Sequence, residues 1–275
     1  MIVANPKIKN FSIFSTPLGY LLDWEFRELL NHEIYTLKIK RAVGSPQNYV
    51  FEKEFEDLPN YFNDLIYKNE HRVLNNLIYY TLELSKNGKE PELFSTSIFE
   101  NNDPVISEVR KKRDIQFDFG GSQKGWLFKL KRGGEICSCF NPVTRKTNAI
   151  DCPKCYGTGI IGGYIKEEEV SAIFQNPQRL MVKNKRPITM EKSYQIILNC
   201  DIPCHEGDIL YFLDRNIIMH VLTGEIIAHN NSIIYQRVFG KEVESYDVLR
   251  RFIALQFDSY PERKRTYIPF DVGRI

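Results

Sequence analysis

The stretch Cys137-Ser138-Cys139-Phe140, followed by Cys152-Pro153-Lys154-Cys155-Tyr156-Gly157-Thr158-Gly159, carries four of the six cysteines of this 275-residue chain. Two close pairs of thiols separated by twelve residues have the spacing of ligands around a tetrahedral metal ion. Residues two apart on an extended strand point to the same side, so Cys137 and Cys139 can act as a pair. The sequence therefore predicts a closed structural zinc site whose ligands are Cys137, Cys139, Cys152 and Cys155.

Other uses of the cysteines fit the pattern less well. A disulfide-stapled secreted domain would be much shorter and would spread its cysteines, whereas all six lie in the second half of this chain. Four thiols without a metal, or a redox dithiol at Cys152–Cys155, are the alternatives, but a thioredoxin-type motif needs a βαβ context. Cys200, Cys204 and His205 can be combined with His220 as a second metal group; packing in the core or in a loop is the favoured interpretation.

Composition indicates an ordinary globular protein. Hydrophobic residues make up 43% and charged residues 26% of the chain, which at this length predicts one large domain or two to three small ones. Lys+Arg 37 against Asp+Glu 35 leaves a net charge of +2, so overall charge does not favour nucleic acid or anionic membrane as a partner. We expect neither secretion nor membrane spanning, because the sequence lacks a signal-peptide pattern and any run of 18 apolar residues.

The sequence pattern of the N-terminal third predicts a series of short strands. Strands rich in β-branched and aromatic residues are separated by Pro and Gly turns, and they cover Phe11–Phe14, Tyr20–Phe26, Ile34–Arg41, Asn48–Phe55 and Leu77–Leu84. Such spacing predicts a small antiparallel sandwich, with Trp24 in its core.

A helix is expected after this part, with Asp103 as its N-cap, Pro104 at its first position and an end before Gly120-Gly121. Ile106 would face the core, and Arg110–Arg113 the solvent. From Arg110 to Arg132 there are eight basic residues and two acidic ones. One interpretation of this strip is a surface that binds phosphates. We favour the other, in which the helix has a solvated face and Trp126–Arg132 is an edge strand protected by lysines.

The C-terminal part again reads as strands that form a small β-barrel. They are expected at Arg179–Lys183, Ser193–Asn199, Ile209–Leu213, Ile217–Leu222 and Ser232–Phe239. The tail mixes bases, prolines and aromatics, which fits either disorder or an arm that docks on a neighbouring subunit.

The chain is therefore expected to be mainly β and to have five parts. These are a β-sandwich at 1–86, a linker with one helix and a strand at 87–131, a zinc-ribbon-like module at 132–165, a small β-barrel at 166–250 and a tail or docking arm at 251–275. We do not expect an enzyme, because no phosphate loop, nucleophile elbow or dinucleotide fingerprint is present.

Two resemblances extend these expectations. Leu21-Leu22-Asp23-Trp24, Tyr35–Arg41 and Leu77–Leu82 resemble a fibronectin type III-like domain. Trp126–Lys129, the two cysteine pairs, Tyr156–Tyr164 and Asp201–Leu210 resemble tailed-bacteriophage virion proteins of the neck or collar. In that family a fibronectin-like domain precedes a zinc-binding core and a small β domain follows it. The first pair here, with one intervening residue, is tighter than the two-residue spacing common in such ribbons.

The resemblance implies a structural protein of the virion neck, assembled in the host cytoplasm. It would form a homo-oligomeric ring at the head-to-tail junction, contacting portal or connector, tail and collar components, with two β domains splayed by a metal-stabilised hinge. The alternatives are a tail or baseplate structural protein, and a zinc-ribbon nucleic-acid-binding protein that uses Arg110–Arg113 and Lys124–Arg132.

Overall fold

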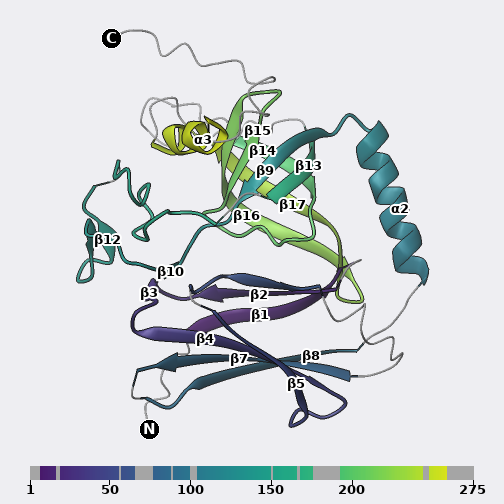
Figure 1. The fold of residues 1–275 in the computed structure, drawn as a ribbon. Helices are drawn as coiled ribbons and strands as arrows, with labels where there is room; N and C mark the ends of the chain where they lie inside the picture. Colours follow the sequence, from purple (N-terminus) through teal and green to yellow (C-terminus); the bar gives the residue numbers. More distant parts are fainter. Residues whose placement is uncertain are drawn as a thin grey trace, which may run out of the picture.

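A computed structural model describes residues 7–16, 19–55, 57–65, 77–87, 89–99, 104–149, 151–165, 168–175, 193–243 and 248–258. The protein is mainly β, as the sequence predicts. Figure 1 shows two stacked sheets at one end of the molecule and a barrel at the other. The cysteine-containing segment lies beside them, near β10 (Gly133–Gly134) and β12 (Lys146–Thr147). Among the described residues no helix is long and apolar enough to cross a bilayer.

The N-terminal two-sheet unit spans residues 8–99. Its first sheet has the order β1 (Ile8–Ser15), β2 (Tyr20–Phe26), β6 (Tyr61–Asp64), and its second has the order β5 (Tyr49–Phe55), β4 (Tyr35–Val43), β7 (Leu77–Lys86), β8 (Glu92–Phe99). The inward side chains of both sheets form one core, in which Trp24 is fully buried as predicted. Alternation of apolar and polar residues along these strands produces this core, since successive side chains point to opposite faces.

Two strands of this unit were not expected from the sequence. β6 has only four residues, and the apolar residues of β8 are interrupted by Ser95-Thr96-Ser97, so neither shows a clear alternating pattern. β8 nevertheless pairs with β7 along its whole length, from Leu77↔Phe99 to Leu84↔Glu92. The sheet therefore continues to residue 99, beyond the expected boundary at residue 86.

The barrel is closed by six strands in the order β13 (Glu168–Phe174), β14 (Ser193–Asn199), β17 (Ser232–Glu242), β16 (Ile217–His229), β15 (Ile209–Phe212), β9 (Gln123–Phe128). The expected barrel was confined to residues 166–250, but β9 comes from the expected linker and pairs with both β13 and β15. Gly125 permits this approach, because a Cβ there would lie 2.6 Å from the Phe212 ring. The expected strand at Arg179–Lys183 lies outside the described residues.

Helix α2 (Pro104–Phe119) begins and ends where the sequence predicts, although its proposed cap Asp103 lies outside the described residues. It lies against β13, β14 and β17, with Ile106 buried. The expectation that Arg110 and Arg113 face solvent is wrong. Arg110 Nη2 donates to Ser15 O at 2.7 Å and Arg113 Nη1 to Ile234 O at 3.0 Å, so both side chains join α2 to the β elements.

Helix α3 (Val248–Asp258) occupies the start of the expected tail. Leu249, Phe252 and Ile253 are buried in a third apolar cluster with Phe128, Ile209, Tyr211 and Ile218 of the barrel. Residues 251–258 are therefore part of the folded body, because apolar side chains at helical spacing cover one end of the barrel. Residues 259–275 lie outside the described part.

The two-sheet unit and the barrel touch directly, so the expected separation by a hinge is wrong. Leu21 of β2 is fully buried in the barrel's apolar cluster. His205 Nε2 lies 2.7 Å from Asp23 Oδ2, and Asn60 Nδ2 donates to Leu130 O at 2.6 Å. Apolar and polar contacts thus hold the two units together independently of the cysteines.

A buried ion pair fixes the segment that leaves β9. Lys129, expected on a solvated edge strand, is 1% exposed, and its Nζ donates to Asp208 Oδ2 at 2.8 Å and Pro203 O at 2.6 Å. Asp208 also accepts from the backbone N–H groups of Leu130 and His205, each at 2.8 Å. These bonds compensate for the removal of both charges from water.

We predict that Asp208→Ala lowers the free energy of unfolding by about 3–5 kcal/mol, because it leaves the Lys129 ammonium buried beside a single carbonyl. Urea unfolding followed by tryptophan fluorescence measures the change. Glu169→Ala is the control. It also removes a carboxylate paired with a lysine of β9, but this pair, Glu169 with Lys124, is exposed. An equal loss of stability in both variants would contradict the role given to Asp208.

Candidate metal centre

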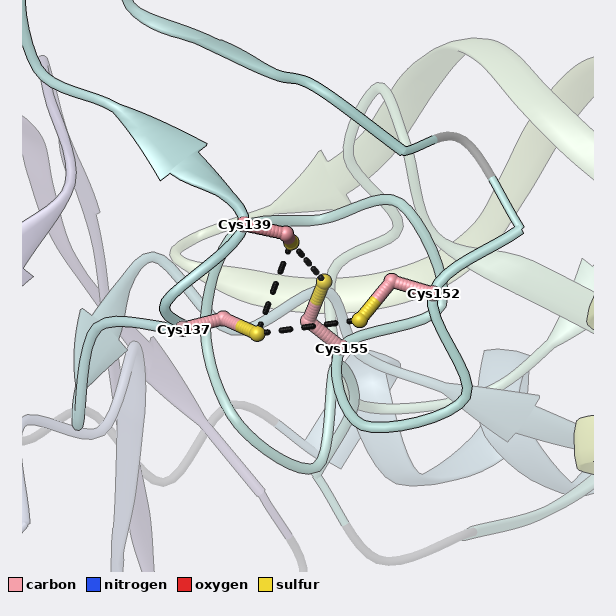
Figure 2. Close-up of side chains that lie close together, drawn as sticks. All are labelled: Cys137, Cys139, Cys152 and Cys155. Atoms are coloured by element: carbon pink, nitrogen blue, oxygen red, sulfur yellow. Dashed lines mark hydrogen bonds between the residues drawn. The ribbon is translucent and has the colours of Figure 1, made fainter.

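The four predicted cysteine ligands converge on one point (Figure 2). Their sulfur atoms all lie within 4.8 Å of one another, and Cys139 Sγ is 3.4 Å from Cys137 Sγ and 3.3 Å from Cys155 Sγ. Cys137 Sγ lies 3.7 Å from Cys152 Sγ. All four thiols are free, so the cluster is not a pair of disulfides.

The first pair lies at the start of a short hairpin. Ile136 forms an antiparallel bridge with Ile160, and the next residue, Cys137, donates its N–H to Gly159 O at 2.9 Å. The chain then reverses through β11 (Phe140–Asn141) and β12 (Lys146–Thr147), and Asn148 N donates to Cys139 O at 2.8 Å. The twelve-residue spacer is therefore the hairpin that returns the chain to the second pair.

The second pair lies on a tight turn. Tyr156 N donates to Cys152 O at 2.8 Å, and both the N–H and the hydroxyl of Thr158 donate to Cys155 O. Tyr156 (φ 50°) and Gly157 (φ 79°) then adopt left-handed backbone conformations. Glycine takes such a conformation at little cost, which explains its presence at 157, whereas Tyr156 adopts it although it carries a Cβ.

The environments of the thiols differ. The backbone N–H groups of Lys154 and Cys155 point to the Cys152 sulfur and lower the pKa of Cys152 to about 6, which stabilises its thiolate. Burial raises the pKa of Cys155, and burial with the neighbouring thiols raises that of Cys139. A bound divalent cation would lower the pKa of Cys139 and Cys155, because it favours the deprotonated sulfur.

This donor set fits a tetrahedral metal ion. Four sulfurs at about 2.3 Å from a central zinc ion would stand about 3.8 Å apart, close to the separations found here. Softness of the four thiolates favours zinc or a similar ion over magnesium or calcium. Because the four cysteines fill all positions of a tetrahedron, the chemistry that the site can perform is structural and leaves no position for a substrate or water.

The segment around the cysteines has little apolar core of its own. Among the described residues from 133 to 163, the buried residues are Cys137, Cys155 and Ile160, together with glycines. Its outer contacts are to the neighbouring units. β10 (Gly133–Gly134) pairs in parallel with β3 (Leu30–Asn31) of the two-sheet unit, and the Tyr156 ring lies 4.7 Å from that of Phe252 on α3. Metal binding would therefore order a segment that touches both units.

The second cysteine group is part of the barrel. Cys200 and Cys204 belong to the barrel's apolar cluster, as the sequence analysis favours, and burial raises the pKa of Cys200 to about 12. His205 faces Asp23, and His220 lies on β16. Among the described residues, Cys137, Cys139, Cys152 and Cys155 form the one group of three or more side chains with metal-binding geometry.

The basic strip from Arg110 to Arg132 does not form one surface. Arg110, Arg113 and Lys129 are directed to backbone carbonyls or buried carboxylates, as described above. Lys124 lies 3.5 Å from Glu169 and Lys112 lies 2.7 Å from Glu108. Most partners of these basic side chains lie in distant segments, so the sequence alone does not reveal them. Glu108 differs, because it lies one helical turn before Lys112.

Comparison with known proteins adds no assignment: no protein-family model matches the chain, and no curated protein matches it significantly. The geometry of the site is thus the main guide to its role.

We predict that Cys152→Ser abolishes stoichiometric metal binding, because it removes the most stabilised thiolate of the cluster. Metal per chain is measured by plasma mass spectrometry after purification without chelators. Cys200→Ser is the matched control, since Cys200 lies outside the cluster. The hydroxyl oxygen that replaces its sulfur can still accept the hydrogen bond from Ile202 N. Full metal content in Cys152→Ser, or its loss in Cys200→Ser, would contradict the assignment.

Metal affinity should rise as pH rises from 6 to 8. The raised pKa values of Cys139 and Cys155 mean that these thiols are protonated in the metal-free protein and must release protons when the ion binds. Competition titrations with a metal indicator at several pH values measure the slope. An affinity independent of pH would show that these thiols are not ligands.

Proposed function

We propose that the chain is a non-enzymatic structural protein of a tailed-bacteriophage virion, part of a neck or collar ring at the head-to-tail junction, with zinc in the four-cysteine site. The observation that carries the proposal is the order of the parts: the two-sheet unit comes first, the four-thiol module follows it, and five of the six barrel strands come after the module, with β9 alone before it. A fibronectin-like domain before a zinc-binding core, with a small β domain after it, is the order in the family that the sequence resembles.

The topology of the first unit supports the fibronectin type III-like assignment. Its sheets have three and four strands, in the orders β1-β2-β6 and β5-β4-β7-β8, and all neighbours are antiparallel. Sandwiches of this type serve as structural and binding modules, and they share an architecture without sequence similarity. A spacer or contact domain of a virion protein is a role that such a unit suits.

Zinc would act as a scaffold element in this protein. The module contacts the two-sheet unit through β3 and β10 and the barrel end through α3. Ordering the module therefore fixes the surface at the junction of the units, and a ring requires such a surface to be the same in every subunit. Heterologous contacts close into a ring only when each subunit repeats the same rotation.

Exposed apolar side chains suit contacts with neighbouring subunits. Val105, Ile115 and Phe119 are 54%, 57% and 86% exposed along α2, and Val143 at the tip of the β11–β12 hairpin is 90% exposed. The α2 residues and Val143 belong to separate elements, so they would serve separate contacts in the proposed assembly. A tail or baseplate position for the same structural protein would use the same surfaces, and the copy number in particles separates these positions.

Quantitative mass spectrometry of purified particles from the source of the gene tests the proposal. About one copy of this chain per portal subunit is the expected result for a neck ring. A large excess over the portal would instead assign the chain to the tail or to the head surface. Absence of the chain from particles would overturn the virion role.

A second prediction concerns the metal. Infection complemented with the Cys152→Ser chain should yield few complete particles, because the module that contacts both units, and the surface it forms, would not be ordered. Electron microscopy and plaque counts measure the loss, with Cys200→Ser as the control. A normal yield of infectious particles from Cys152→Ser would show that zinc has no part in assembly.

A further inference from the structure

A cleft of about 690 Å³ lies where the cysteine module, the barrel and the two-sheet unit meet. Its walls come from the segment after β9, from β12, from the Tyr156 turn and from the start of α3. A volume of this size is within the range of sites for small ligands or short pieces of a polymer. The cleft is separate from the four sulfurs, which do not line it.

The cleft gathers positive charge. Lys131 and Arg132 line it from one segment, and Arg145 and Lys146 from the hairpin, while no carboxylate occurs among the described residues of its lining. Within the described part of the chain, Lys131, Arg132 and Lys146 form no ion pair; Arg145 Nη2 lies 3.8 Å from Glu28 Oε2. Like charges held together in a concave surface repel one another, and an anion that enters the cleft relieves this repulsion.

Aromatic rings lie beside these cations. Phe140 and Tyr156 line the cleft and are half-buried, so each still presents surface to it. The ring of Tyr156 is held in place by Phe252, whose centroid is 4.7 Å away. Basic side chains interleaved with aromatic rings are the combination with which proteins bind single-stranded nucleic acid, because phosphates meet the cations and bases stack on the rings.

We propose that this cleft binds a short segment of single-stranded nucleic acid, with phosphates near Lys131, Arg132, Arg145 and Lys146 and bases near Phe140 and Tyr156. Lys131 and Arg132 belong to the strip from Arg110 to Arg132, whose members Arg110, Arg113 and Lys129 are engaged inside the protein. Arg145 and Lys146 lie outside that strip. A single strand is favoured over a duplex because bases must reach rings that lie within the cleft. The site does not depend on the virion role, and each can fail without the other.

The test is fluorescence anisotropy with a labelled ten-residue oligothymidylate and the full-length, metal-loaded chain. We expect salt-dependent binding with a slope of log K against log salt of about −3, since each phosphate contact to a single strand contributes about −0.7. Arg132→Gln combined with Lys146→Gln should weaken binding about tenfold and reduce the slope by roughly half. Thermal unfolding and metal content of the variant establish that the fold and the module are retained.

Lys111→Gln combined with Lys112→Gln is the control, because it removes the same charge from the exposed face of α2 and should leave the affinity unchanged. Phe140→Leu should weaken binding without changing the salt slope, as expected for a stacking contact. Three results would each overturn the proposal: undetectable binding at low salt, equal binding of a glutamate decapeptide or a DNA duplex, and loss of binding in the α2 control.

Discussion

The convergence of four thiols is the constraint on which the centre of this molecule depends. In the described part of the segment from residue 133 to 163 few apolar side chains are buried, so hydrophobic burial there contributes little stability. Its hairpin, its bridge between Ile136 and Ile160 and its left-handed turns bring the sulfurs within 4.8 Å of one another. A bound metal ion would convert this local geometry into folding free energy, as structural zinc does in other small modules.

Contacts other than those of the cysteines also stabilise the junction between the two-sheet unit and the barrel. Leu21 extends from the two-sheet unit into the barrel core, and the buried pair of Lys129 and Asp208 fixes the chain as it leaves β9. Gly133 lies so close to Leu58 that a Cβ would be 2.3 Å from the Leu58 Cβ. Loss of the metal should therefore disorder the module more than it separates the two-sheet unit from the barrel.

Charge is used in two ways along the same stretch of chain. Arg110, Arg113 and Lys129 satisfy carbonyl and carboxylate groups of other elements, so their contribution is to the fold. Lys131 and Arg132, only a few residues further on, face a cleft together with cations of the hairpin. A count of basic residues cannot distinguish these uses, because the partners of each side chain lie up to 121 residues away in sequence.

The sequence by itself determined which four cysteines converge, the mainly β character, the buried Trp24 and both ends of α2, because these depend on local spacing, alternation and turn residues. It also located β2 and β14 at the correct residues. Only the tertiary structure decided that β9 closes the barrel, that β8 completes the second sheet, that α3 is part of the body, and that Lys129 is buried. Each of these depends on pairing or packing with distant segments, which local patterns do not encode.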